Sequence, residues 1–198
     1  MRFPRFVPIV VIALAIVLIG PLPAAGQSTE NDPPIVGRIV GLVGTVTVHR
    51  GDATMPATDG VWVAERDRLV TGVEGRVEVR FTDGTRIVIG ATSDVVVSDY
   101  ALTETGRRSR GVLSLLGGLL RAVVAPGSDD GGLDVRGRAA VASVRSTEFV
   151  VTETPEGNAV LTVEGLVAVA ARTGDEAGPA PNDPLPRGAV LLGPGEGV

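Results

Sequence analysis

The side chains that could carry out catalysis are few and widely separated in the sequence. His49 is the only histidine, and the chain contains neither cysteine nor lysine. A Ser–His mechanism would therefore depend on His49. This residue ends the run TVTVHR, where we interpret it as a surface residue at a strand edge. A phosphate-binding P-loop is excluded because its motif requires a lysine.

Acidic residues offer two further kinds of chemistry. Paired carboxylates can hydrolyse a glycosidic bond without histidine or cysteine, but nothing in the spacing selects two of the five candidates: Asp94, Asp99, Glu148, Glu153 and Glu164. The segment 128–132, with Asp134 beyond it, contains oxygen ligands that suit Ca²⁺ but lacks the ligand order of an EF-hand loop. Exposed positions on strands and turns explain the five carboxylates, and a polar turn explains the segment 128–132. We therefore expect no catalytic, cofactor-binding or metal-binding site, and no enzyme.

The first 26 residues have the order of a secretory signal peptide. Arg2 and Arg5 precede the apolar run Val7–Ile19, and the small residues 24–26 follow it. This run is shorter than the ~20 residues of a membrane span. An uncleaved anchor is thus the minor alternative, and it would be the only contact of the chain with a membrane. We expect a periplasmic or secreted domain, stabilised by its core alone because no cysteine is available for a disulfide.

Charge and aromatic content narrow the choice of partners. The formal net charge is −5, and an acidic chain repels the phosphate backbone, so we expect no nucleic-acid partner. Only 3% of the residues are aromatic, which leaves little material for stacking sugars or bases. We expect four aromatic side chains to pack in the core: Trp62, Phe81, Tyr100 and Phe149.

Short β-strands are the elements that must position these residues. The apolar runs are rich in β-branched residues and are separated by Gly, Asp and Pro, which is typical of strands. The clearest runs are residues 45–48, 68–71, 76–81, 86–89, 95–97, 139–144, 148–152, 159–163, 166–170 and 189–192. Their spacing predicts an all-β fold of many short strands, either a β-sandwich or a solenoid.

Two segments carry more detailed predictions. In 76–81, Val77, Val79 and Phe81 alternate with charged residues, which predicts a strand with one packed face and one wet face. The segment 111–124, GVLSLLGGLLRAVV, can be read as a helix. Because its two central glycines would cost ~2 kcal/mol inside a helix, we favour two strands joined by a glycine turn.

The same pattern suggests a simple domain organisation. After the signal peptide, residues 27–37 are polar and contain proline, and we expect a flexible lead-in. Residues 38–171 form the β domain. Residues 172–187 are proline-rich and acidic, which predicts an extended loop. Residues 188–198 supply a last strand and tail of the same domain.

The stretch RFTDGTRIVIG, residues 80–90, places Asp83-Gly84 between two apolar runs. This arrangement is the strongest short hairpin signal, since both residues tolerate positive φ. We therefore interpret Asp83 and Gly84 as a bend in the chain and not as a ligand loop, with Thr85 starting the returning strand.

The order of these motifs resembles the FecR-type periplasmic domain. In that family a G-x-V strand leads to D-x-L-x-T-G, then to F-x-D-G-T-x-L-x-L-G-x-x-S, followed by G-G-x-L-R, V-R-G-T-x-F-x-V, V-x-E-G-x-V and a glycine-rich end. The matching segments here are residues 44–46, 67–72, 81–93, 117–121, 144–151, 163–167 and 193–196. The resemblance covers residues 38–198. One departure is Ser146, which replaces the glycine of the V-R-G-T motif.

The resemblance implies a non-enzymatic β domain that binds a protein or envelope partner in a sensing or scaffold role. Its family-motif residues, structural or binding, are Asp83, Gly84, Thr85, Arg145, Thr147 and Phe149. For family members that regulate sigma factors, the resemblance implies a different domain order: a cytoplasmic helical segment, then a membrane span, then this domain. With an export signal at its start, this chain is expected to be a stand-alone exported form.

Two alternatives remain open at this point. Partner binding could use strand edges through β-augmentation. The rival reading is a carbohydrate- or peptidoglycan-binding module, which would need an exposed Trp62 beside Tyr100 in a groove. In the segment 144–151, which matches the V-R-G-T-x-F-x-V motif, we interpret Phe149 and Val151 as core residues and Arg145 and Glu148 as a surface ion pair.

Overall fold

The computed structural model describes residues 32–127, 131–172 and 188–198. The predicted signal peptide and residues 173–187 of the predicted loop lie outside these ranges. All the regular elements of the described residues are β-strands, which confirms the all-β prediction. Over the same ranges, no helix has the length and apolar character that a membrane crossing requires.

Fifteen strands follow one another along the described residues. Their bounds are β1 Ile35–Val43, β2 Val46–Arg50, β3 Ala53–Pro56, β4 Trp62–Ala64, β5 Arg68–Thr71, β6 Arg76–Phe81, β7 Arg86–Ile89, β8 Asp94–Leu102, β9 Arg108–Val123, β10 Leu133–Arg136, β11 Ala140–Val144, β12 Glu148–Thr154, β13 Gly157–Glu164, β14 Val167–Ala171 and β15 Val190–Leu192. The observed β6 and β7 have the predicted limits. β1 begins at Ile35, three residues before the predicted start of the domain, because Val36 is already buried in the core.

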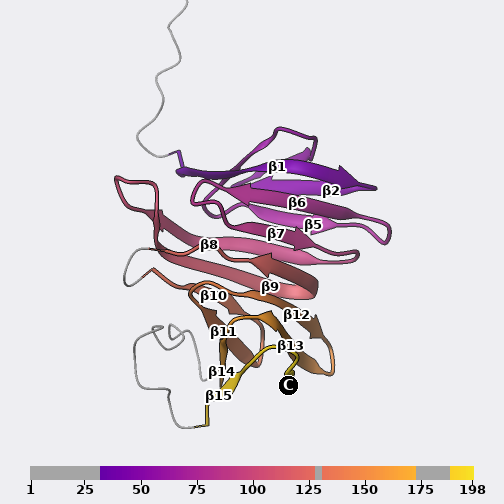
Figure 1. Cartoon of the computed structure of the whole chain (residues 1–198). Coiled ribbons are helices and arrows are strands. Elements are labelled where there is room, and N and C mark those ends of the chain that lie inside the picture. The colour runs from indigo at the N-terminus through magenta and orange to yellow at the C-terminus, as the bar shows by residue number, and fades with distance from the viewer. Residues whose placement is uncertain (1–31, 128–130, 173–187) are drawn as a thin grey trace, which may run out of the picture. The chain divides into compact units, whose positions relative to one another are not determined.

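The strands form two sheets that share β9. Sheet A has the order β4-β1-β6-β7-β9-β12-β13, and sheet B has the order β3-β2-β5-β8-β9-β10-β11-β14-β15. Strands of the two sheets lie in successive tiers, from β1 and β2 at one end to β14 and β15 at the other (Figure 1). The pairings are antiparallel except that between β9 and β10, which is parallel. This arrangement accounts for the alternation of short strands and turns along the chain.

The core lies between the two sheets. In β6, Val77, Val79 and Phe81 are buried while Arg76 and Arg80 are exposed, as the alternation predicted. Phe81 of sheet A stacks on Tyr100 of sheet B with ring centroids 4.3 Å apart and an interplanar angle of 6°. The stacked pair therefore joins the sheets at the point where the DGT turn begins.

The glycine pair of residues 117–118 bends one strand and does not join two. β9 runs through both residues, pairing with β8 and β10 before the bend and with β7 and β12 after it. Gly118 has a φ of +88°, and a Cβ there would overlap Ser93. The predicted glycine turn was wrong because the chain needs the positive φ to pass from sheet B to sheet A.

The DGT segment is a hairpin turn, as predicted. Phe81 N–H donates to the Thr85 carbonyl at 2.8 Å, and Gly84 N–H donates to the Phe81 carbonyl at 3.1 Å. Gly84 has a φ of +91°, whereas Asp83 is not among the residues with positive φ. The turn is therefore a three-residue loop that ends in a left-handed glycine. The expectation of positive φ at both residues was wrong.

Some edge strands of the two sheets are covered by other parts of the chain, and others are not. The last residues of the chain cover the free edge of β13, where Val160 N–H donates to the Val198 carbonyl at 2.7 Å and Val198 N–H donates back at 3.0 Å. Among the described residues, β4 pairs only with β1, β3 only with β2 and β15 only with β14. These three strands are thus edge strands, where β-augmentation could occur, although on β4 the Trp62 carbonyl and the Ala64 N–H are already hydrogen-bonded to the side chains of Arg50 and Asp67.

Candidate functional site

Asp83 and Arg108 form a buried ion pair beneath the DGT turn. An Nη1–H of Arg108 donates to Oδ2 of Asp83 at 2.5 Å, and both side chains are fully buried. The Asp83 oxygens also accept hydrogen bonds from Thr85 N–H at 3.1 Å and from the Thr85 hydroxyl at 2.8 Å. The Asp83 carboxylate, expected from the sequence only to form a bend, therefore points into the protein.

Tyr100 completes the surroundings of Asp83. Its hydroxyl donates to Oδ1 of Asp83 at 2.9 Å. Burial of the phenol, and next the negative charge of Asp83, raise the pKa of Tyr100 well above its ordinary value. The positive charge of Arg108, and next the hydrogen bonds with Thr85 and Arg108, lower the pKa and oppose this rise. Tyr100 therefore stays protonated as a structural donor, which does not suit it to act as a base near neutral pH.

Arg108 links the DGT turn to three other segments of the chain. Its Nε–H donates to the Gly132 carbonyl at 3.0 Å, and Nη2 donates to the carbonyls of Ala125 at 3.1 Å and Arg145 at 3.2 Å. The Thr85 hydroxyl accepts from Arg108 Nη1 at 2.8 Å and from Ala125 N–H at 3.2 Å. Two of the family motifs, DGT and V-R-S-T, thus meet at one guanidinium.

Arg108 is a functional position that no pattern in the sequence identifies. It lies in a polar segment, RRSR, and nothing in the spacing distinguishes it from the exposed arginines on either side. A buried arginine needs a charged partner, and that partner is 25 residues away in the sequence. The pairings of β8 and β7 with β9, which align Tyr100 with Gly111 and Arg86 with Val123, bring the two residues together.

The family-motif residues of the V-R-S-T segment have mainly structural contacts. Phe149 and Val151 are buried, as predicted. The Thr147 hydroxyl donates to the Leu166 carbonyl at 3.0 Å. The predicted Arg145–Glu148 pair was wrong, because Glu148 pairs with Arg121 of the neighbouring strand β9.

Two further motif positions also serve the interior. Asp67 is fully buried and accepts hydrogen bonds from Arg50 Nε at 2.8 Å and from Ala64 N–H at 2.8 Å. The Thr71 hydroxyl donates to the Gly90 carbonyl at 2.6 Å and accepts from Ser93 N–H at 2.8 Å. The polar residues of the D-x-L-x-T-G motif therefore hold turns together.

Four of the five candidate carboxylates form ion pairs with arginines, and the fifth, Glu164, lies opposite Glu148 in the β12–β13 register. Asp94 pairs with Arg68 at 2.5 Å, Asp99 pairs with Arg110 at 2.7 Å, and Glu153 pairs with Arg138 at 2.8 Å. No group of three metal-ligating side chains occurs within residues 32–127, 131–172 and 188–198. Of the segment weighed above as a source of Ca²⁺ ligands, residues 128–130 lie outside these ranges, and Asp134 accepts a hydrogen bond from Ser143 at 2.7 Å.

The histidine and the two aromatic residues considered for catalysis or sugar binding do not form a site together. His49 lies in β2, where its Nδ1 is 3.0 Å from the Thr54 hydroxyl across the β2–β3 pair. Trp62 is 58% exposed, so the prediction that it packs in the core was wrong. It belongs to the edge strand β4 and faces away from the core, whereas its neighbour Val63 is buried. Tyr100 is buried, so the two aromatic residues do not share a groove.

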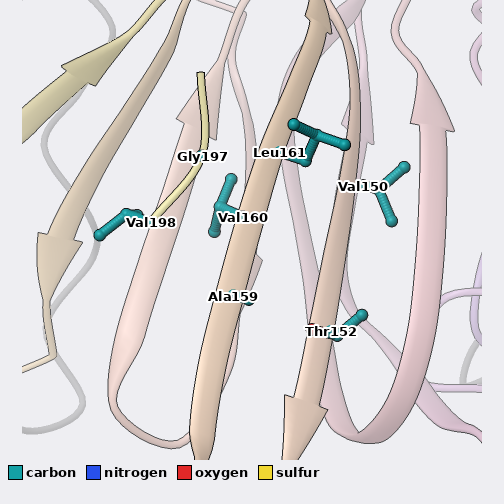
Figure 2. Close-up of a pocket in the computed structure, with 7 residues that line it drawn as sticks. All are labelled: Val150, Thr152, Ala159, Val160, Leu161, Gly197 and Val198. Atoms are coloured by element: carbon teal, nitrogen blue, oxygen red, sulfur yellow. The ribbon is translucent and has the colours of Figure 1, made fainter. Parts of the chain in front are cut away.

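A shallow apolar groove lies on the outer surface of sheet A. It has a volume of about 300 Å³ and is lined by Val150, Thr152, Ala159, Val160, Leu161, Gly197 and Val198. Figure 2 shows the lining residues of β13 between those of β12 and the C-terminal residues Gly197 and Val198. None of the lining side chains is charged, and Leu161 and Val198 are 46% and 59% exposed. The groove can therefore receive an apolar group, and it holds no residue suited to catalysis.

Comparison with known proteins gives one family and one group of structures. The family model described as FecR protein matches residues 67–168. Two crystal structures of a protein from Parabacteroides distasonis, described as a candidate anti-sigma factor, share 20% and 21% identity with TM-scores of 0.49 and 0.48. Each alignment covers 66% of this chain and 52% of the other. The comparison with curated proteins found no match.

Proposed function

Because the chain belongs to the FecR family, we propose that it acts by binding a protein of the cell envelope or the extracellular space, in a sensing or scaffold role and without catalysis. The internal contacts of its motif residues support this proposal. Asp67, Asp83 and Thr85 are all used to hold strands and turns together. These contacts leave the outer sheet surfaces and the strand edges for recognition.

The apolar groove is the observation that favours a protein partner. Leu161, Val163 and Val198 are each at least 46% exposed, and they lie on β13 and on the tail that covers its edge. Exposed apolar groups gathered on one surface mark protein interaction sites more often than scattered ones do. The partner is thus expected to place an apolar side chain against β13.

Photocrosslinking in the native host tests this proposal. A photoreactive amino acid at position 161 of the full chain should give a discrete adduct with one envelope protein. The matched control is position 73, where Val73 is 82% exposed but lies on a turn far along the chain from the groove. Equal adducts at both positions, or adducts at neither, would contradict a partner site at the groove.

We also propose that the chain works in the periplasm or outside the cell, which rests on the predicted signal peptide. The N-terminus of the protein recovered from cell fractions provides the test. A protein beginning at Gln27 in the periplasmic or external fraction is expected. A full-length chain retained in the cytoplasm would contradict this localisation.

A second candidate function, carbohydrate or peptidoglycan binding, is favoured by the exposure of Trp62. An exposed indole in an edge strand can stack against a sugar ring. Buried Tyr100 cannot contribute, so a sugar site would depend on Trp62 and on the polar residues beside it in sheet A.

A further inference from the structure

Three arginines and one tryptophan lie in a row across the outer face of sheet A. Trp62 of β4 is opposite Arg38 of β1, Arg38 is opposite Arg80 of β6, and Arg80 is opposite Arg86 of β7. All four side chains are exposed, while the residues next to them in each strand are buried. Directly opposed residues of antiparallel strands have Cα atoms about 5 Å apart. We call these four residues the arginine row.

The charges of the arginine row are poorly compensated. Neither Arg38 nor Arg80 forms an ion pair with any residue that the structure describes, and Arg86 approaches Glu78 only to 3.8 Å. On the outer face of sheet B, by contrast, Arg68 pairs with Asp94 at 2.5 Å and Arg110 pairs with Asp99 at 2.7 Å. Like charges directly opposed across strands are destabilising, so the row lowers the stability of the free domain.

This surface also has the opposite sign to the whole chain. The outward-facing charged residues of β1, β6 and β7 are Arg38, Arg76, Glu78, Arg80 and Arg86, and on the neighbouring strands β9 and β12 Arg121 is paired with Glu148. The formal net charge of the chain is −5. A basic strip on an acidic protein attracts an anion to one place on the surface.

We propose that the arginine row binds an anionic glycan, a polysaccharide with a carboxylate on successive sugars. A guanidinium binds a carboxylate with two parallel hydrogen bonds, and the inter-strand spacing is comparable with the length of one sugar residue. The exposed indole of Trp62 at the end of the row offers a ring face against which a sugar can stack. The polymer would cross the strands from β7 to β4.

The composition of the row favours a glycan over an acidic protein segment. The core of a protein interface is apolar and depleted in charge, whereas here the centre consists of arginines and the single apolar group lies at one end. The apolar groove on β12 and β13 has the composition expected of a protein site. The inference thus deepens the second candidate function and does not depend on a partner at the groove.

A titration of the full chain with polygalacturonate, a polymer of sugar carboxylates, tests the proposal. Trp62 is the only tryptophan, so its fluorescence reports binding at the end of the row. The expected result is a saturable change whose affinity falls as salt is added. The double variant Arg38→Gln/Arg80→Gln should weaken binding about tenfold or more. It should melt no earlier than the unaltered chain, because it removes opposed like charges.

Three further variants show whether the glycan binds at the arginine row. Arg110→Gln removes a charge on sheet B and should change the affinity less than about twofold. Leu161→Glu alters the apolar groove and should leave polygalacturonate binding intact even if it abolishes the adduct with a protein partner. Trp62→Ala, followed by calorimetry, should weaken binding of polygalacturonate but not of polyglutamate.

The proposal would be overturned by any of three results. These are the absence of binding by the unaltered chain, an equal loss in Arg110→Gln and the double variant, and tighter binding of polyglutamate than of polygalacturonate. The last result would assign the arginine row to an acidic protein segment.

Discussion

The carboxylate of Asp83 accepts a hydrogen bond of 2.5 Å from the guanidinium of Arg108, and water reaches neither side chain. Through this pair the DGT turn of sheet A is joined to the carbonyl groups of Ala125, Gly132 and Arg145. Breaking a buried pair on one side leaves an uncompensated buried charge. The contact explains why an acidic turn residue in a family motif can be essential to the fold without touching a ligand.

Tyr100 provides a spectroscopic test of this buried site. It is the only tyrosine, so tyrosinate absorbance reports it alone. Burial raises its pKa above the ordinary value of 10.0. We expect no tyrosinate in the folded chain at the pH where the chain unfolded in urea titrates, near pH 10. Folded and unfolded chains that titrate together would contradict the burial of the phenol.

The same shift predicts how stability depends on alkaline pH. Because the folded pKa of Tyr100 lies above the unfolded one, the unfolded chain releases its proton first as the pH rises through about 10. The stabilisation is fully present below pH 10 and decreases above it, by at most about 1.4 kcal/mol per pH unit for this one group. Urea unfolding measured on either side of pH 10 checks the sign. The Tyr100→Phe variant is the control, and its slope should be smaller.

The bend of β9 predicts different effects at two adjacent glycines. Gly118→Ala should lower the free energy of unfolding by at least about 2 kcal/mol, since it combines a positive φ with overlap against Ser93. At Gly117 a Cβ meets nothing within 4 Å, so Gly117→Ala should be tolerated. Urea denaturation of both variants provides the comparison. Equal losses at the two positions would show that the bend is not centred on Gly118.

The hairpin turn predicts a cost for a side chain at Gly84. Gly84→Val should lower the melting temperature, because a β-branched residue resists the φ of +91°. The expected cost is about 1–2 kcal/mol, and it comes from the backbone because a Cβ would meet Ala125 at an ordinary 3.7 Å. Gly41→Val is the matched control, since its Cβ has open space and its φ is not positive. An unchanged midpoint for Gly84→Val would contradict the turn.

Local features of this fold could be predicted from the sequence, and long-range ones could not. The limits of β6 and β7 follow from alternating residues and from the DGT turn between them, all within 14 residues. The bend at Gly118 could not be distinguished from a turn, because both need a glycine with positive φ. That distinction depends on Ser93, which lies against Gly118, donates its hydroxyl hydrogen to the Ala91 carbonyl and accepts a hydrogen bond from Leu119 N–H.

The candidate sites show the same division. The sequence identified Asp83 as a turn residue but not its partner Arg108, because arginines of the same segment are exposed. Trp62 was assigned to the core from its residue type alone, although its strand lies at the edge of sheet A and turns the indole outward. The arginine row depends on the register of β4, β1, β6 and β7, of which only β6 and β7 are consecutive in the sequence.

The central claim is that Asp83 serves the interior as the partner of Arg108, and a double-mutant cycle tests it most directly. The free energies of unfolding in urea would be measured for the full chain, Asp83→Ala, Arg108→Ala and the double variant. We predict a coupling energy of at least about 2 kcal/mol between the two residues. The same cycle on the exposed pair Asp99 and Arg110 should give less than about 1 kcal/mol. A coupling between Asp83 and Arg108 within about 0.5 kcal/mol of zero would contradict the claim.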